Sequence, residues 1–346
     1  MAILGALLLA ACGAAPPAGP PRTGAPSGSP PSTGGGPGAA CSPIANLDRF
    51  SDQLNKTDFQ GNFVGNLSGL AKQPDGDILA LSDRSLLFTL DGRTLRPKAV
   101  QPLTDRGGSP LDSEAVALDE DGTRLITSET EPSIGRYPVG SATPTEELPV
   151  PPELRVAPPG RASRNLTFEG LTRAGDVLTA SMEGPLRGDQ ANLRRFQTWN
   201  RVGGHFGLAA QYGYRVDPAA GVSEIAALGD GRLLVLERGY LPGIGNSVRL
   251  YLADPRRASN VVTVTDLAER TGVTLMGKTL VADLVHCPSL GATNNETQAN
   301  PLLDNVEGMT VLSREPDGTT RLLLVSDDNA SRKQTTRLYW LTARIN

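Results

Sequence analysis

Five segments of the chain share one pattern of apolar and polar positions. Each begins with a run of small and apolar residues, turns at a stretch containing Gly or Asp, and continues with a second apolar run. Two short apolar runs joined by such a turn predict a β-hairpin. The segments are LSGLAKQPDGDILALSDR (67–84), SEAVALDEDGTRLITSE (113–129), FEGLTRAGDVLTASMEG (168–184), SEIAALGDGRLLVLERG (223–239) and NVEGMTVLSREPDGTTRLLLVSDDN (305–329).

Each hairpin is followed by one or two further strand-like runs, such as SLLFTLDG after the first and SVRLYLAD after the fourth. Units of three or four strands that recur along a chain are typical of a β-propeller. A β-sandwich would not repeat one motif, and the repeat of a β-helix is much shorter. We therefore predict an all-β chain folded as a β-propeller. Abundant Gly and Pro, with few aromatic residues, agree with short strands and tight turns.

The number of blades stays open between five and six. Five blades carry the hairpin motif, and a sixth could lie between residues 254 and 305, where LMGKTLVADL predicts an extra pair of strands. The segment near DRFSDQLN (48–55) could supply the strand that closes the ring.

Acidic residues flank most of these hairpins. In an antiparallel hairpin, residues at equal distance from the turn lie opposite each other. We therefore expect Glu114 opposite Glu129, Glu169 opposite Glu183, Glu224 opposite Glu237, Glu307 opposite Asp327, and Ser68 opposite Asp83. Because the innermost strand of each propeller blade lines the axis, these pairs would gather at one end of the central channel.

A ring of like charges can stay ionised in a partly enclosed site only beside compensating cations. Many oxygen ligands, with His and Cys absent from the motif, favour Ca²⁺. The candidate ligands or general bases are Glu169, Glu224, Glu307 and Asp327, and the further candidate metal ligands are Asp83, Glu114, Glu129, Glu183, Glu237 and Asp328. Arg84 and Arg238, each directly after a flanking acid, could offset some of the negative charge or orient an anionic substrate. The alternative is structural: the acids could accept backbone N–H bonds from the neighbouring blade.

These motifs together resemble the bacterial family described as phytase-like domain, or esterase-like activity of phytase. The resemblance rests on GNLSGLA with LSDR, SEAVAL, FEGLT with MEGPL, GVSEIAALGDGRLLVLERG, and DNVEGM with LLLVSDDN, in order from about residue 62 to 343. It implies a propeller and the hydrolysis of esters or phosphoesters. By analogy with the calcium-dependent alkaline phytases, calcium ions in the channel mouth would hold substrate phosphates and activate water.

Two hairpins depart from the pattern of this family. The first has Ser68 and Gly69 where the others have an acid, and the third ends in Glu183 without a following Arg. The first departure weakens the expectation of a complete acidic ring. No Lys lies directly beside the flanking acids, which argues against phytate itself unless calcium carries the anion.

The first residues, MAILGALLLAAC, form an apolar run that is too short to span a bilayer and ends in small residues, as in a secretory signal. LAAC resembles the bacterial lipobox, in which the cysteine, here Cys12, is lipidated. The alternatives are an ordinary cleaved signal and a chance apolar start. No Lys or Arg precedes the run, so the true start codon could lie upstream. We expect a signal peptide over 1–12, a disordered Gly/Pro-rich tether over 13–45, and the propeller over 46–346.

Two further cysteines, Cys41 and Cys287, could form a disulfide in an oxidising compartment, or stay as unpaired thiols. With two His and three Cys in the chain, no zinc set can be assembled by spacing. A Ser-His-acid triad would have to use His205 or His286, and the sequence has no Gly-x-Ser-x-Gly elbow, P-loop or dinucleotide fingerprint.

The net charge of the chain limits the classes of molecule that it is expected to bind. A net charge of -4 without a basic stripe argues against nucleic acid. We predict a monomeric enzyme at the cell envelope, held at the membrane by a lipid anchor only, that hydrolyses a small-molecule ester or phosphoester with Ca²⁺ as cofactor. Two alternatives stay open: a noncatalytic propeller binding module, and a lactonase of the gluconolactonase type.

Overall fold

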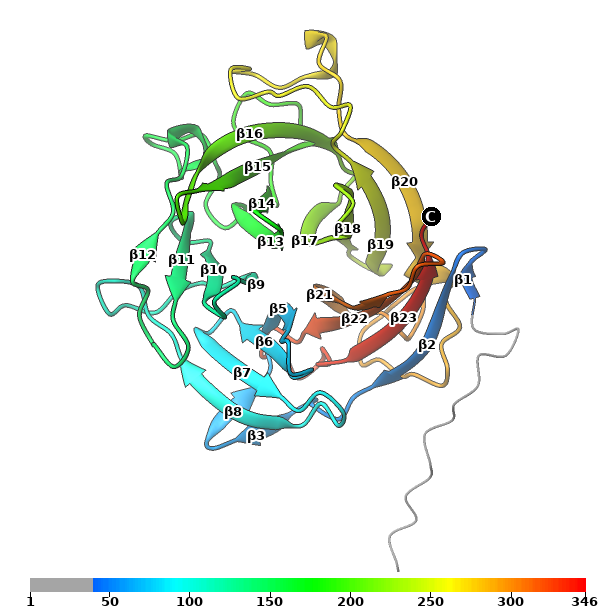
Figure 1. Cartoon of the computed structure of the whole chain (residues 1–346). Coiled ribbons are helices and arrows are strands. Elements are labelled where there is room, and N and C mark those ends of the chain that lie inside the picture. Colours follow the sequence, from blue (N-terminus) through cyan, green and yellow to red (C-terminus); the bar gives the residue numbers. More distant parts are fainter. Residues whose placement is uncertain (1–39) are drawn as a thin grey trace, which may run out of the picture. The chain divides into compact units, whose positions relative to one another are not determined.

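The computed structural model describes residues 40–346, which fold into a five-bladed β-propeller (Figure 1). Each blade is one antiparallel sheet, and the five sheets are arranged around a common axis. Within residues 40–346 the structure has no α-helix. The all-β propeller predicted from the repeated hairpins is therefore confirmed, with five blades.

Four blades consist of four consecutive strands, the first of which lies innermost. Blade 1 contains β5 (Leu67–Lys72), β6 (Ile78–Ser82), β7 (Leu86–Leu90) and β8 (Pro97–Pro102). Blade 2 contains β9 (Val116–Leu118), β10 (Arg124–Ser128), β11 (Ser133–Tyr137) and β12 (Glu146–Glu147). Blade 3 contains β13 (Phe168–Ala174), β14 (Val177–Met182), β15 (Leu193–Val202) and β16 (His205–Arg215). Blade 4 contains β17 (Gly221–Ala227), β18 (Leu233–Leu241), β19 (Gly245–Asp254) and β20 (Gly277–Asp283).

Blade 5 combines both ends of the described chain. Its strands are β21 (Asn305–Arg314), β22 (Thr319–Asp327) and β23 (Leu338–Arg344), followed outwards by β2 (Ala45–Ser51) and β1 (Ala40–Ser42). Pairing of β2 with β23 closes the ring, and β2 overlaps the segment 48–55 expected in this role. A disulfide joins Cys41 in β1 to Cys287, in the loop after blade 4. Residues 40–45 therefore belong to the propeller and not to the tether expected up to residue 45.

The interval between residues 254 and 305 does not form a sixth blade. Its strand β20 is the outermost strand of blade 4, and the remainder consists of loops with two short 3-10 helices, η2 (Glu269–Thr271) and η3 (Leu284–His286). A third, η1 (Pro152–Leu154), lies between blades 2 and 3. The hairpin of β3 (Thr57–Phe59) and β4 (Asn62–Val64) leads into blade 1.

The hydrophobic core lies between the blades. Side chains alternate along a strand, so each strand contributes to the interfaces on both sides of its blade. In β18, Leu234 and Leu236 pack with residues of blade 5, whereas Leu233 and Val235 pack with residues of blade 3. Five buried clusters of this kind join successive blades around the ring. The ends of the inner strands are thereby left to polar residues.

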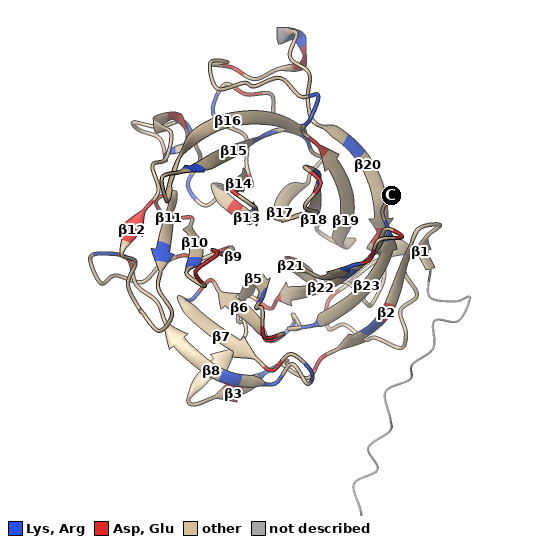
Figure 2. Cartoon of the chain, viewed as in Figure 1, with Lys and Arg blue, Asp and Glu red and all other residues tan. Residues whose placement is uncertain are grey.

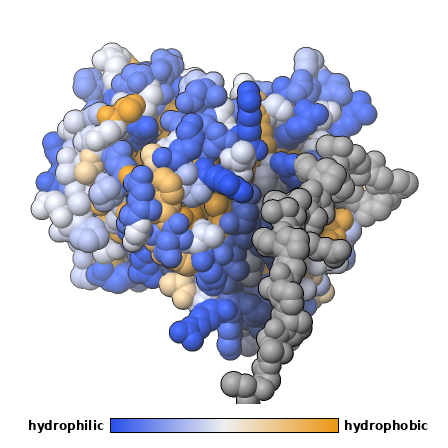
Figure 3. Space-filling view, turned by 90° about the horizontal axis from the view of Figure 1, so that it is seen from below, coloured by the Kyte–Doolittle hydropathy of each residue, from blue (hydrophilic) through white to orange (hydrophobic). Residues whose placement is uncertain are grey.

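The outer surface visible in Figure 3 is mainly hydrophilic, with apolar side chains in scattered patches. Among the residues that the structure describes, no helix is long and apolar enough to cross a membrane. Cys12, the expected signal peptide and the tether up to residue 39 lie outside the described residues.

Candidate functional site

A β-bulge positions the repeated acid of the inner strands. In four blades the pairing between the inner strand and the next one shifts register, and the residue left unpaired is Ser68, Glu169, Ser223 or Glu307. In blade 4 the acid Glu224 follows the unpaired residue and is itself paired with Leu236. A bulge inserts one extra residue into one strand and changes the direction of its side chain. Because of it, Ser68, Glu169 and Glu307 face the channel although the strand around them packs against neighbouring blades.

The bulge also overturns the expected mirrored pairs. In every blade the second flanking residue lies opposite the residue two positions before the repeated acid, and not opposite the acid itself. The observed partners are Asn66 with Asp83, Asp112 with Glu129, Thr167 with Glu183, Val222 with Glu237 and Asn305 with Asp327. The mirrored geometry predicted from the sequence is therefore wrong, because the extra residue of the bulge does not appear in the apolar pattern.

Glycines next to the acid let the inner strands approach each other closely. A Cβ at Gly69 would lie 2.7 Å from the carbonyl oxygen of Glu114, and a Cβ at Gly170 would lie 2.8 Å from the backbone nitrogen of Ile225. Both distances are too short for a real side chain. We call the ring of inner-strand backbone at Gly69, Gly170 and Gly308 the waist. Below it, a cavity of about 210 Å³ lies between the inner strands on the side of the hairpin turns.

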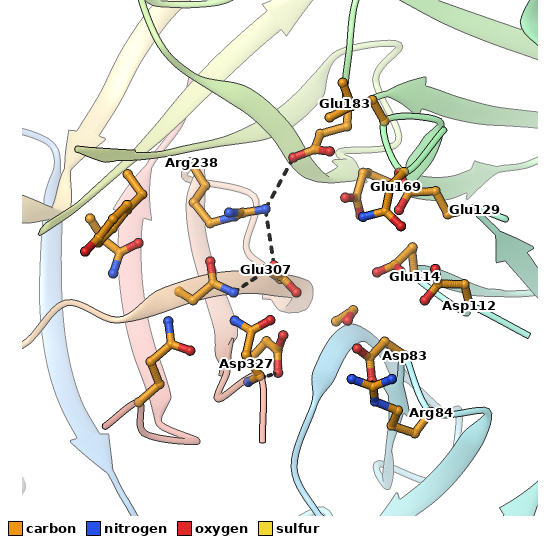
Figure 4. Close-up of a pocket in the computed structure, with 18 of the residues that line it drawn as sticks. Asp83, Arg84, Asp112, Glu114, Glu129, Glu169, Glu183, Arg238, Glu307 and Asp327 are labelled. Atoms are coloured by element: carbon orange, nitrogen blue, oxygen red, sulfur yellow. Dashed lines mark hydrogen bonds and ion pairs between the residues drawn. The ribbon is translucent and has the colours of Figure 1, made fainter. Parts of the chain in front are cut away.

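Above the waist lies a cavity of about 710 Å³, which we call the mouth. Figure 2 shows acidic residues around the ends of the inner strands, and Figure 4 shows their side chains in the cavity. The residues predicted from the sequence that line it are Asp83, Arg84, Glu114, Glu129, Glu169, Glu183, Arg238, Glu307 and Asp327. The propeller thus brings together nine side chains from all of its blades.

Two overlapping triads of carboxylates occupy one side of the mouth. The carboxylate oxygens of Asp112, Glu114 and Glu129, and those of Glu129, Glu169 and Glu183, lie within 4.8 Å of one another. Burial raises the pKa of Glu129 to about 7 and holds the pKa values of Glu114 and Glu169 well above the usual range, and neighbouring carboxylates add to the effect. The charged forms of these groups are costly unless a cation joins them.

Arg238 neutralises the opposite side of the mouth (Figure 4). Its Nη2 lies 3.3 Å from Glu183 Oε1 and 3.2 Å from Glu307 Oε1. Glu307 Oε1 also accepts a hydrogen bond of 2.9 Å from Asn305 Nδ2. Burial raises the pKa of Glu183, although the charge of Arg238 opposes this. Arg238 is therefore already engaged by two carboxylates.

Asp83 and Asp327 extend the acidic wall along blades 1 and 5. Burial raises the pKa of Asp327 to about 8, Glu307 adds to this shift, and Asp327 Oδ1 accepts the Asn329 N–H at 2.8 Å. Burial also raises the pKa of Asp83 to about 6, against the opposing charge of Arg84, whose Nε lies 3.4 Å away. The side chain of Arg84 is 69% exposed and therefore stands at the rim.

Glu224 does not line the mouth. The register of blade 4 shifts between Val222 and Glu224, so Ser223 takes the structural position of Glu169 and Glu224 takes that of Gly170. It is fully buried, and its Oε1 accepts the N–H of Leu171 in blade 3 at 3.0 Å and that of Ile225 at 2.8 Å. Burial raises the pKa of Glu224 well above its usual range. The bond to Leu171 is the contact between blades that the structural alternative anticipated for the acids.

Glu237 and Asp328 also lie outside the mouth. Glu237 Oε1 lies 2.6 Å from Lys278 Nζ and accepts a hydrogen bond of 2.7 Å from the Tyr214 hydroxyl. Asp328 is buried, accepts the Asn66 N–H at 3.0 Å and pairs with Lys56. These two acids stabilise the blades and their connections, and neither is placed to touch a ligand in the mouth.

Several residues of the mouth have no counterpart in the predicted set. They are Asp112, Asn165, Tyr240, Asn246, Glu296, Asn305, Asn329 and Gln334. Asp112 and Asn305 could have been found, because each stands two residues before a repeated acid, at the position that the bulge places opposite the second flanking residue. Tyr240 and Asn246 lie at the adjoining ends of β18 and β19, and the others come from loops; none of them carries a repeated signal.

The donor set fits a hard divalent cation. Asp112, Glu114, Glu129 and Glu169 supply oxygen ligands only, and in the described chain no Lys or Arg lies within ion-pair distance of them. Six to eight oxygens, several of them from carboxylates, are what Ca²⁺ prefers. The two clusters together offer five carboxylates for such a shell, so the residues present fit the cation expected from the sequence.

Comparison with known protein families assigns the chain to one of them. Residues 62–330 match the family called Phytase-like, which is described as esterase-like activity of phytase. The chain is a member of this family. The Phytase-like segment includes the hairpins of all five blades and every residue of both carboxylate triads. No curated protein sequence matches the chain.

Solved structures with a similar fold share little sequence with this Phytase-like chain. Glutaminyl cyclase from Myxococcus xanthus is 14% identical, with a TM-score of 0.44, over 88% of this chain and 100% of that one. A gluconolactonase from Xanthomonas campestris is 11% identical, with a TM-score of 0.42, over 82% of this chain and 73% of that one.

Proposed function

We propose that this protein is a calcium-dependent hydrolase of phosphoesters or related esters, and that the mouth is its active site. The observation that supports this most is the pair of overlapping carboxylate triads, most of whose members lack an ion-pair partner in the described chain. Asp112, Glu114, Glu129, Glu169 and Glu183 would hold the cation. When bound, Ca²⁺ would polarise an oxygen of the ester and lower the pKa of water in its coordination shell.

Asp327 is the residue best suited to carry a proton. With a pKa of about 8 it can accept or release a proton near neutral pH, which a general base requires. Its Oδ1 is held by the Asn329 N–H, so the proton would be carried on Oδ2. Arg84 at the rim would attract an anionic group of an approaching substrate.

The ion pairs of Arg238 limit the charge of the substrate that the mouth can bind. Because Glu183 and Glu307 already neutralise it, the interior of the mouth has no free basic side chain among the described residues. A highly charged polyphosphate would be repelled by the remaining carboxylates unless several cations accompanied it. This favours, as a second candidate, the hydrolysis of a weakly charged ester or lactone at the same site.

The place of action is part of the proposal. LAAC at the N-terminus and the Gly/Pro-rich stretch after it support a lipid anchor on Cys12 at the cell envelope, with the propeller acting as a monomer. The change Cys12→Ser should move the protein from the membrane fraction to the soluble fraction. If the protein stays in the membrane fraction, the anchor is elsewhere.

Titration calorimetry with Ca²⁺, together with release of p-nitrophenol from phosphate and acyl esters in the same samples, tests the function. We expect binding, and turnover that chelation abolishes and added Ca²⁺ restores. Binding without turnover on either substrate would favour the noncatalytic binding module. The absence of binding would mean that the carboxylates serve only the fold.

A further inference from the structure

A second cavity, of about 400 Å³, adjoins the mouth and shares Leu166 and Glu183 with it. We call it the side pocket. Its remaining wall includes Pro185 and Ala191 from the loop before β15, Arg194 in β15, and Val216 and Ala220 from the loop between β16 and β17. Most of this wall is apolar. A molecule bound in the mouth can therefore extend into a partly apolar space of its own.

Arg194 gives the side pocket a positive charge. Its side chain is buried, and its guanidinium donates only to backbone carbonyls: Nη1 to Ala191 and Leu193 at 2.8 and 3.1 Å, and Nη2 to Ala220 at 2.9 Å. In the chain from residue 40 onwards, no carboxylate lies within ion-pair distance of it, and its Nε has no hydrogen-bond partner. A buried cation without an opposite charge is destabilising, so an anion beside it would be favoured.

Three acids lie near Arg194, and each is engaged by another partner. Glu183, at the junction of the two cavities, pairs with Arg238. Glu237 lies 2.6 Å from Lys278 Nζ. Asp217, in the wall of the side pocket, lies 2.8 Å from Lys278 Nζ and 2.9 Å from Arg249 Nη1. None of the three forms an ion pair with Arg194, which therefore keeps its charge available to a ligand anion.

We propose that the side pocket binds a carboxylate-bearing arm of the substrate beside Arg194, while the ester bond of the same molecule lies in the mouth. The proposal deepens the proposed hydrolase function and rests on it. The apolar wall suits a short aliphatic or aromatic arm better than a free inorganic anion, since such an arm removes apolar surface from water. The substrate class is thus an ester in which one half carries a carboxylate.

Calorimetry with benzoate and with its neutral analogue benzamide tests this arrangement without requiring turnover. On the full protein, benzoate should bind on the order of tenfold more tightly than benzamide, because a hydrogen bond to a charged group is stronger than one to a neutral group. The preference should persist in EDTA. If chelation removes it, the benzoate was bound to a cation in the mouth, and the proposal is overturned.

Two variants locate the binding. The change Arg194→Gln should reduce the preference for benzoate to nearly one, whereas Arg194→Lys should retain most of it. Arg194 is buried, so Arg194→Gln could also impair folding.

The change Ala191→Trp tests the location without touching Arg194. Ala191 is exposed at the pocket wall, and a Trp there should weaken the binding of both ligands at least tenfold. Ala99→Trp, on the exposed outer strand of blade 1, is the matched control and should change nothing.

Equal affinity for benzoate and benzamide, or unchanged benzoate binding in Ala191→Trp, would overturn the proposal. Turnover separates this outcome from failure of the hydrolase function. If the protein hydrolyses esters but does not prefer benzoate, the side-pocket proposal is rejected and the hydrolase function stands. If the protein is inactive but shows a preference for benzoate that depends on Arg194, the hydrolase function is rejected and the carboxylate-binding pocket stands.

Discussion

The two sides of the mouth contain the same kind of residue and differ in what neutralises it. On the side of blades 2 and 3, Glu114, Glu129 and Glu169 lie together without an ion-pair partner among the described residues. On the other side, Arg238 neutralises Glu307 and also reaches across to Glu183, the member of the second triad at the boundary between the two sides. The first side requires a cation from solution to be fully ionised at neutral pH, whereas the second side carries its own.

The register of blade 4 produces this difference. Its bulge falls at Ser223, so Arg238 lies opposite Gly221, two residues before the bulge. Glu183 and Asp327 hold the same position in blades 3 and 5. Blade 4 therefore has a cation where these blades have an acid, and this one position neutralises acids of the blades on either side.

The largest effect is expected from removing charge on the unneutralised side. The double change Glu129→Gln and Glu169→Gln should lower the affinity for Ca²⁺ on the order of a hundredfold, because both triads lose a charged ligand. Calorimetry measures it, and Glu315→Gln, an exposed acid at the β21–β22 turn, is the control. Unchanged affinity in the double variant would show that the cation binds elsewhere.

The stability of the cation-free protein should fall as the pH rises. Asp83, Glu129 and Asp327 have folded-state pKa values of about 6, 7 and 8, above those of free carboxyls. The stability that they contribute is fully present below about pH 4 and is lost as the pH rises through these values. We expect the free energy of unfolding in EDTA to decrease by more than about 2 kcal/mol between pH 5 and 8.

Urea unfolding at several pH values, with EDTA or with Ca²⁺, measures this dependence. Saturating Ca²⁺ should remove most of the decrease, because it binds the ionised form of the folded protein. A stability that is flat across this range in EDTA would contradict the assigned burial of these charges. The double variant of Glu129 and Glu169 should show a shallower decrease than the parent protein.

Replacing Arg238 should make its side of the mouth resemble the side of blades 2 and 3, where no cationic side chain neutralises the acids. The change Arg238→Gln leaves Glu183 and Glu307 without their partner, so the cation-free protein should be less stable and the affinity for Ca²⁺ should rise about fivefold. Calorimetry and thermal unfolding report the two effects. Arg84→Gln, at the exposed rim, should change the affinity less than about twofold. Weaker calcium binding in Arg238→Gln would mean that Arg238 orders the ligands.

The smallest effect is expected at Glu224. The sequence places Glu224 in the same class as Glu169, but Glu224→Gln should change calcium affinity less than about twofold, because its side chain serves the contact between blades. Glu224→Ala should instead destabilise the protein by about 1–3 kcal/mol, since the N–H groups of Leu171 and Ile225 lose their acceptor. A large loss of calcium binding in Glu224→Gln would place this carboxylate at the metal after all.

The fold could be predicted from the sequence because hairpins and their turns are local, and five copies repeated one pattern. The register at the mouth could not, since a bulge adds a residue without altering the order of apolar and polar positions. The direction of Glu237 could not be predicted either, because Lys278, which attracts it, lies in a later strand of the same blade. Asp112 was missed because the bulge that places it opposite Glu129 leaves no mark in the apolar pattern.

The close approach of neighbouring backbones at Gly69, Gly170 and Gly308 marks a level between two cavities on the axis. The mouth above this level and the cavity of about 210 Å³ below it share no lining residue. A side chain at any of the three positions would push neighbouring inner strands apart. The diameter of the ring at the level of the acids therefore depends on three residues that lack a side chain.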